Sequence, residues 1–229
     1  MKNPATKILC MVAIFILTNC TNPSGFQYLH PEYGNKKETH PKVLVLPMNS
    51  KSIITASSNG NTSNLIGNAT FREAEMFENY MKIIIGEKTQ TEIVAEEISD
   101  DVKEVKLEKQ KVDIDRMSLE FQIPKLSEKN GRFAQIDYLV IFDKLYFTKL
   151  AKISGSSLGS IGESTYLLTA GIEYIIWDNK TRNLVSYGKV EEKSNLLTVP
   201  KKEDYLNVIE KLADVIIQKS PFTAKKIYF

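Results

Sequence analysis

Apolar and polar residues alternate most regularly between Thr165 and Trp177. Successive side chains of a strand point to opposite faces, so six apolar residues of this stretch share one face: Tyr166, Leu168, Ala170, Ile172, Tyr174 and Ile176. The other face is mixed, which is typical of a sheet with one buried face. Residues 178–183 have the composition of a turn, and a second strand follows over 184–191. The pattern therefore predicts a long antiparallel hairpin over 165–191.

Three further apolar runs predict strands elsewhere in the chain. Residues 42–47 (Lys-Val-Leu-Val-Leu-Pro) are rich in β-branched residues and end at proline, as a buried strand often does. The other two candidates are 91–96 and 136–143, the latter extended by 144–153. The Ser-, Asn- and Gly-containing stretches 48–69 and 154–162 predict loops.

Two segments have helical spacing. Apolar residues recur at three- and four-residue steps over 70–85, behind the capping box Thr70-Phe71-Arg72-Glu73, and we expect Gly86 to end this helix. Residues 201–218 carry a similar apolar stripe, with a proline before them and another beyond. Residues 97–130 are highly charged; we expect helical material there, although 118–123 alternate as a strand would.

These elements predict a single globular domain over 42–229. The order is strand, helix, strand, a possible helix, strand, hairpin and helix. Such an order is typical of an α/β (α+β) fold, with a mixed β-sheet covered by helices mainly on one face.

The N-terminus has the three zones of an export signal. Lys2 and Lys7 precede ten consecutive apolar residues, Ile8 to Leu17. This run is too short to span a bilayer as a helix but fits the apolar region of a signal peptide. Alternatives are an ordinary signal peptide cleaved nearby and a short buried apolar segment. Residues 20–41 are polar and contain three prolines, and we expect them to form a flexible tether.

The end of that run, Leu17-Thr18-Asn19-Cys20, resembles the lipobox of bacterial lipoproteins. Asn19 departs from the small residue that is usual before the cysteine. The resemblance implies removal of 1–19 as signal peptide. It also implies attachment of a diacylglycerol and a further fatty acid, such as palmitate, to Cys20. Several acyl chains hold a protein stably on a membrane, where one chain is marginal.

Charge and cysteine content exclude several classes of partner and site. The chain has 30 Lys and Arg and 28 Asp and Glu, and removal of the signal would leave 28 of each. A balanced chain without a basic run is not expected to bind nucleic acid. The only cysteines are Cys10 and Cys20, so the body has no disulfide and no thiol nucleophile.

Candidate catalytic and ligand-binding patterns are incomplete. Gly155-Ser156-Ser157-Leu158-Gly159 matches G-x-S-x-G, but His30 and His40 both precede Ser157, whereas that mechanism places its histidine after the serine. The same loop lacks the P-loop lysine, so no nucleotide is expected. Four acids, Asp100, Asp101, Asp113 and Asp115, lack the spacing of a calcium loop. We expect no metal site and no cofactor, while a pair of carboxylates brought together by the fold stays open.

Three aromatic residues lie on the predicted hairpin: Tyr174, Trp177 and Tyr187. If exposed, they would anchor a protein partner. If buried, they would cover the sheet. The sequence leaves both readings open, and the three are our candidates for a partner-binding surface.

The body resembles a group of bacterial envelope lipoproteins that includes the curli secretion lipoprotein and the activator lipoproteins of penicillin-binding proteins. The likeness rests on three segments, 43–47, 136–140 and 175–185, in the order found in that group. Where the group usually has glycine in the hairpin turn, Asn183 follows Arg182, and we expect asparagine to supply the left-handed conformation.

The resemblance and the lipobox together predict a non-enzymatic lipoprotein, anchored to a membrane of the cell envelope, most simply the outer membrane. It would bind or scaffold another envelope protein. Two alternatives are a lipid-anchored hydrolase with a carboxylate-based site and a surface-displayed adhesin-like binding protein. A deep cleft with clustered acids would favour the hydrolase.

Overall fold

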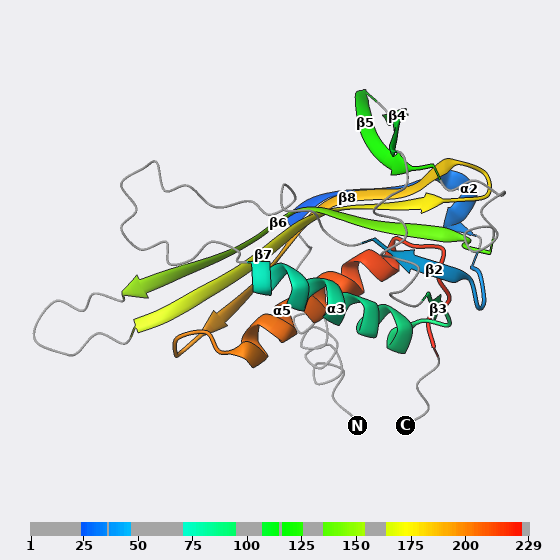
Figure 1. Ribbon diagram of the computed structural model, residues 1–229. Helices are drawn as coiled ribbons and strands as arrows, with labels where there is room; N and C mark the ends of the chain where they lie inside the picture. Colours follow the sequence, from blue (N-terminus) through cyan, green and yellow to red (C-terminus); the bar gives the residue numbers. More distant parts are fainter. Residues whose placement is uncertain are drawn as a thin grey trace, which may run out of the picture.

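The structure, a computed structural model, describes residues 24–35, 37–46, 71–94, 107–114, 116–125, 135–153 and 164–225. Six strands form one sheet in the order β1-β8-β7-β6-β2-β3 (Figure 1). Their bounds are Ser24–Leu29 (β1), Lys42–Val45 (β2), Glu92–Ile93 (β3), Tyr138–Ile153 (β6), Ser164–Asp178 (β7) and Asn183–Leu196 (β8). Strand β2 runs parallel to β3 and β6, and the other pairs are antiparallel. The sheet is thus mixed and the fold is α+β, as predicted.

Two long helices cover one face of the sheet: α3 (Phe71–Lys88) and α5 (Lys202–Gln218) (Figure 1). Phe77 and Met81 of α3, and Val208 and Leu212 of α5, are buried in the same core as the sheet side chains beneath them. The prediction that Gly86 ends the first helix was wrong. The helix continues to Lys88, and the amide and hydroxyl of Thr89 donate to the Ile85 carbonyl at 3.1 and 2.6 Å.

Gly86 instead lets the helix approach the sheet. A Cβ at this position would lie 3.3 Å from Ile93 Cγ1 of β3, closer than most side chains tolerate. The glycine is therefore a packing residue within the helix rather than a helix end.

A two-stranded hairpin covers part of the opposite face. Strands β4 (Leu107–Ile114) and β5 (Met117–Pro124) pair in antiparallel register, and our prediction of helical material over 97–130 was wrong for this part. Along β4 the better-buried positions are the even-numbered ones, ending with Ile114 at 1% exposure. This period of two matches a strand, and the expected alternation over 118–123 lies within β5.

The predicted hairpin over 165–191 is confirmed as β7 and β8, joined by a turn at residues 179–182. The left-handed residue of this turn is Arg182, with φ of 58°, and Asn183 begins β8. The expectation that Asn183 supplies the left-handed conformation was therefore wrong by one position. The left-handed backbone is unfavourable for a residue other than glycine. The Arg182 side chain offsets this cost with an ion pair to Glu108 of β4 at 3.1 Å and a hydrogen bond to the Pro124 carbonyl at 3.2 Å.

The prediction of a flexible tether over 20–41 was wrong from Ser24 onward. Strand β1 pairs with β8 along its whole length, from Ser24 opposite Glu191 to Leu29 opposite Ser186. A short helix, α2 (Pro31–Gly34), follows, with proline at its first turn and His30 as its N-cap. Proline is well suited to the first position of a helix, so the prolines that suggested a tether also fit an ordered segment.

Candidate functional site

The candidate lipid-attachment residue, Cys20, lies outside the described residues. Strand β1 begins four residues after it in the sequence, at Ser24. Four residues span at most about 14 Å when fully extended.

The three hairpin aromatics are buried, so of the two readings that the sequence left open, the structure favours aromatics that cover the sheet over an exposed partner-binding surface. The exposed fractions of Tyr174, Trp177 and Tyr187 are 0%, 1% and 2%. Trp177 and Tyr187 lie beneath the β4–β5 hairpin, where the Tyr187 ring centroid is 5.5 Å from that of Phe121. Tyr174 lies on the opposite face, in the core under the helices. The alternating pattern indicated only one buried face of the sheet. Here the helices cover one face and the β4–β5 hairpin covers the other, so aromatics on both faces are buried.

Tyr174 also ties three strands together. Its ring lies over Gly188 of β8, the residue directly opposite it. Beyond Gly188 its hydroxyl accepts a hydrogen bond from Gln27 Nε2 of β1 at 3.0 Å. Gln27 is itself the register partner of Gly188, and its side chain also donates to the Val215 carbonyl of α5 at 3.2 Å. The first ordered strand is thus locked to the sheet and to a helix.

The same arrangement recurs on the opposite face, one strand away. The Tyr146 ring of β6 lies over Gly171 of β7, and its hydroxyl donates to the Glu191 carboxylate of β8. Gly171 is the register partner of both residues. Burial and this hydrogen bond raise the pKa of the Tyr146 hydroxyl, so it stays a donor at neutral pH.

Beside Tyr146 is a cavity of about 260 Å³ on the sheet face, lined by backbone and side chains of β1, β6, β7 and β8. Its most enclosed charge is Glu173, whose side chain is 13% exposed. This carboxylate accepts a hydrogen bond from the Tyr187 hydroxyl at 2.7 Å and pairs with Lys144 at 2.5 Å and Lys189 at 3.7 Å. Burial and the Glu173 carboxylate raise the pKa of the Tyr187 hydroxyl.

The charges around this cavity balance one another. Glu173 is held by two lysines, and Glu191 pairs with Lys193 at 2.7 Å while accepting from Tyr146. Each carboxylate therefore has a cation within reach, and the cluster cross-links strands at the middle of the sheet. No sequence pattern predicted this cluster. The one available signal was Glu173, the only charged residue within the alternating stretch 165–177.

The other candidate residues from the sequence that the structure describes do not line this cavity. His30 accepts from the Glu32 amide at 3.4 Å and packs against Tyr33, whose ring centroid is 5.9 Å away. His40 adopts a left-handed backbone, with φ of 58°, and Asp113 lies on β4. Ser157, Asp100, Asp101 and Asp115 lie outside the described residues. Within the described part of the chain, no three metal-binding side chains cluster together.

Among the described residues, no helix combines the length and the apolar character needed to cross a bilayer.

Comparisons with known proteins identify no family for this chain. No protein-family model matches it, and no curated protein matches it. Among solved structures it is similar to the PelC dodecamer from Paraburkholderia phytofirmans, at 11% identity and a TM-score of 0.38, over 89% of this chain and 99% of that one. A second PelC crystal form has 10% identity and a TM-score of 0.37, over 87% and 99%. The hypothetical protein CT253 from Chlamydia trachomatis has 6% identity and a TM-score of 0.41, over 80% and 98%.

Proposed function

We propose that this chain is a lipoprotein of the bacterial cell envelope, anchored through acyl chains on Cys20, most simply in the outer membrane. One observation carries the proposal. The ten-residue apolar run Ile8 to Leu17 is followed directly by Thr18-Asn19-Cys20, and strand β1 begins four residues later at Ser24. Cleavage before Cys20 would make this cysteine the first residue of the mature chain, only four residues before the first strand of the sheet.

Substitution of the two cysteines tests the anchor. In the wild type, intact mass should show a mature chain that begins at Cys20, is heavier by several acyl groups and fractionates with membranes. The Cys20→Ala variant should carry no acyl group. Cys10→Ala is the matched control, because it removes the other cysteine from within the apolar run and should leave lipidation unchanged. A soluble wild-type chain, cleaved elsewhere and unmodified, would refute the proposal.

We further propose that the domain binds or scaffolds another envelope protein and is not an enzyme. The support is the state of the two carboxylates that line the sheet-face cavity. Glu173 and Glu191 are both held by lysine and tyrosine side chains, an arrangement that stabilises the sheet and leaves neither free to act as a general base.

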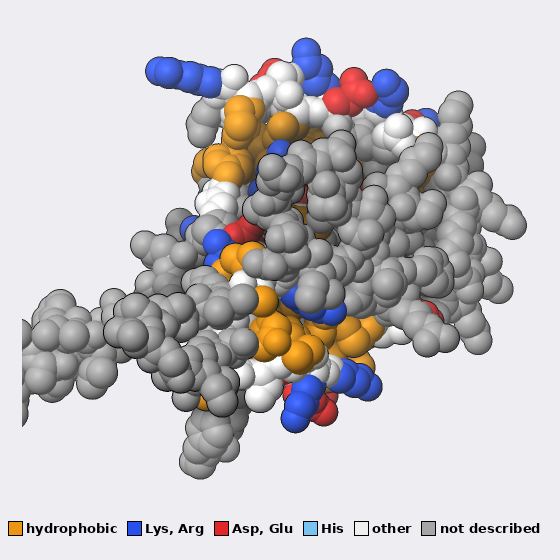
Figure 2. All heavy atoms as spheres, turned by 90° about the vertical axis from the view of Figure 1, so that its left-hand side faces the viewer, with side chains coloured by type: hydrophobic (Ala, Val, Ile, Leu, Met, Phe, Trp, Pro, Cys, Tyr) orange, Lys and Arg blue, Asp and Glu red, His pale blue; other side chains and the backbone are white. Residues whose placement is uncertain are grey.

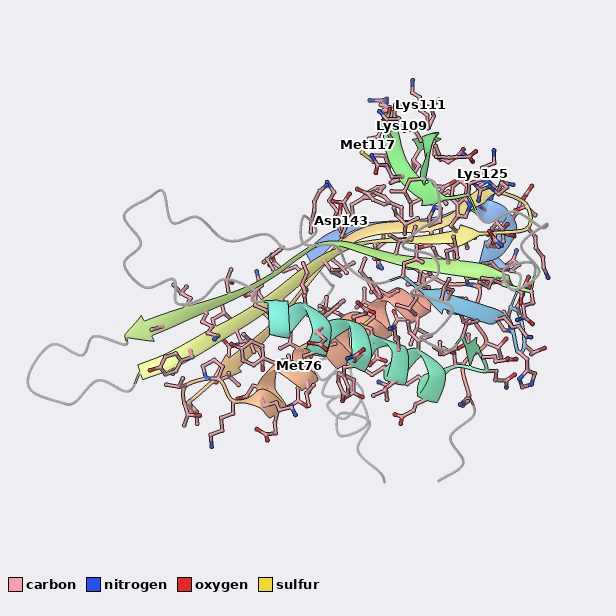
Figure 3. All side chains as sticks on the ribbon, viewed as in Figure 1. Met76, Lys109, Lys111, Met117, Lys125 and Asp143 are labelled. Atoms are coloured by element: carbon pink, nitrogen blue, oxygen red, sulfur yellow. The ribbon has the colours of Figure 1, made fainter. Side chains whose placement is uncertain are left out.

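The partner surface that fits this domain is the β4–β5 hairpin. One side of the hairpin packs on the sheet, and its Lys109, Lys111, Met117 and Lys125 side chains point outward (Figure 3). Leu107 and Met117 are 51% and 40% exposed although both are apolar. Exposed apolar residues among lysines provide both contact area and orientation for a protein partner.

Photo-crosslinking in intact cells tests this surface. A photoreactive amino acid at position 117 should give one discrete adduct with an envelope protein. The same residue at position 83, an isoleucine of α3 that is 51% exposed, is the control and should not give that adduct. Equal adducts from both positions, or none from position 117, would remove the hairpin as the partner site.

A further inference from the structure

The sheet extends past its own edge strand to form a projecting arm. Strand β1 begins opposite Glu191, whereas β8 continues to Leu196 alongside β7 and β6. In Figure 1 these three strands run on toward the left of the start of β1. Because β1 and β8 are antiparallel, the N-terminal end of β1 points toward the end of this arm. The segment 193–202 contains the last residues of β8, the connection to α5 and the first residue of that helix; it is called the tip segment below.

The tip segment combines exposed apolar side chains with lysines. Leu197 is 81% exposed and Val199 is 62% exposed, more than any other large apolar residue in the described part of the chain. The sequence Lys-Ser-Asn-Leu-Leu-Thr-Val-Pro-Lys-Lys contains three lysines, and acidic residues flank it, with Glu191 and Glu192 before it and Glu203 and Asp204 after it. Figure 2, which faces this end of the molecule, shows hydrophobic side chains on it together with both basic and acidic ones.

Two lysines of the tip segment are accessible, because Lys201 and Lys202 are exposed. Lys193 pairs with Glu191 at 2.7 Å. Lysines that flank apolar residues suit the interface of an anionic bilayer, because the apolar groups enter the acyl boundary while the ammonium groups stay among the headgroups.

Cys20 and the tip segment lie within comparable distances of the start of β1. From Glu191, opposite Ser24, to Leu196 the strand advances five residues, roughly 17 Å. Cys20 precedes Ser24 by four residues, which span at most about 14 Å. These lengths allow a lipidated Cys20 and the tip segment to contact the same membrane surface.

We propose that the tip segment is a second membrane-contacting site, which binds an anionic lipid surface beside the acylated Cys20. It rests on the proposed lipidation of Cys20. Leu197 and Val199 enter the interfacial region, and Lys201 and Lys202 contact lipid phosphates. Two contacts fix the orientation of the domain and present the β4–β5 hairpin to its partner at a defined angle.

Site-specific quenching in the lipidated mature protein tests the proposal. The mature body has no cysteine after Cys20, so Leu197→Cys provides a single site for an environment-sensitive fluorophore. The protein is reconstituted in vesicles of phosphatidylglycerol and phosphatidylcholine that carry spin-labelled lipid. The probe at position 197 should be quenched several times more strongly than a probe at Leu107→Cys, which is also exposed but lies on the β4–β5 hairpin. Val199→Cys serves as a second tip probe.

Charge reversal and lipid composition complete the test. Lys201→Glu and Lys202→Glu in the Leu197→Cys background should each weaken tip contact roughly fivefold, and vesicles of phosphatidylcholine alone should weaken it similarly. Equal quenching at positions 197 and 107, or tip probes that remain unquenched, would overturn the proposal; energy transfer between tip probes would assign the surface to a second copy of the chain. Failure of lipidation is recognised separately, because the chain would then lack acyl mass and would not enter the vesicles.

Discussion

The ring of Tyr174 lies so close to Gly188 on the neighbouring strand that no larger residue fits there. A Cβ at position 188 would be 2.5 Å from Tyr174 Cε1. On the opposite face, a Cβ at Gly171 would be 2.1 Å from Tyr146 Cζ. The two sites differ in freedom, because Tyr174 is fully buried whereas Tyr146 is half-buried. Glycine in a strand interior often marks such a close approach.

The two glycines should therefore respond differently to substitution. Gly188→Ala should lower the free energy of unfolding by about 1–3 kcal/mol, the usual cost of overpacking a buried site. Gly171→Ala should cost less, because the Tyr146 ring can swing toward solvent. Urea unfolding of both variants measures the difference. Equal losses would show that Tyr146 is held as firmly as Tyr174.

The hydrogen bond between Tyr33 and Asp178 fastens α2 to the β7–β8 turn. The Tyr33 hydroxyl donates to Asp178 Oδ2 at 2.7 Å, and the amides of Lys180 and Thr181 donate to Oδ1 at 2.8 Å. Tyr33→Phe should cost about 1.5–3 kcal/mol, the contribution of a hydrogen bond to a charged group. A double-mutant cycle with Asp178→Asn isolates the pair, and additive losses would show that the two residues act independently.

Tyr33 also makes the fold sensitive to alkali. Burial raises the pKa of Tyr33 from 10.0 to about 12. The Asp178 carboxylate adds to this increase, whereas a hydrogen bond with Thr181 opposes it. The unfolded chain then loses this proton at lower pH than the folded chain, so the stability contribution is complete below about pH 10 and is lost as the pH rises toward about 12. Unfolding followed against pH should be less steep in this window for Tyr33→Phe. An unchanged profile would assign the alkaline loss to other tyrosines.

The burial of Trp177 can be observed directly, because it is the only tryptophan in the chain. At 1% exposure under the β4–β5 hairpin, it should emit at short wavelength and resist quenching by iodide. Denaturation should shift the emission to longer wavelength. Strong iodide quenching of the folded protein would restore the sequence-based hypothesis of an exposed aromatic anchor.

Glu192 should act against stability at neutral pH. It lies on the helix-covered face at 8% exposure, and burial raises its pKa despite the nearby Lys211. An acid with a raised pKa favours the folded state only once it is protonated, so its cost is present above the folded pKa and disappears in acid. Glu192→Gln should raise the thermal midpoint at neutral pH, with little change at acid pH. A lower midpoint at neutral pH would show that the charge is stabilised by Lys211.

Local patterns of apolar residues predicted the elements that have a regular buried face. The alternation over 165–177 predicted β7, because one face of that strand is covered along its length. The apolar stripe over 201–218 predicted α5, because its three- and four-residue spacing matches the helical repeat. Both elements appear within a residue or two of their expected bounds.

Other features depended on contacts between distant parts of the chain. The charges of β4 suggested a helix, yet its alternating positions cover Trp177 and Tyr187, which sequence patterns cannot bring together. Residues 24–35 looked like a tether because prolines and glycines are shared by tethers and short ordered turns. Only pairing with β8, more than 150 residues away in the sequence, made β1 a strand.

The sequence alone predicted the main strands and helices, and it is the source of the hypotheses of an export signal and a lipid cysteine, because these patterns lie in neighbouring residues. Tertiary structure decided which aromatics are buried and which carboxylates are paired with lysines. It also decided that the tip segment and the start of β1 face the same end of the molecule. Those relationships arise from antiparallel register between strands, which sets distances that no local pattern contains.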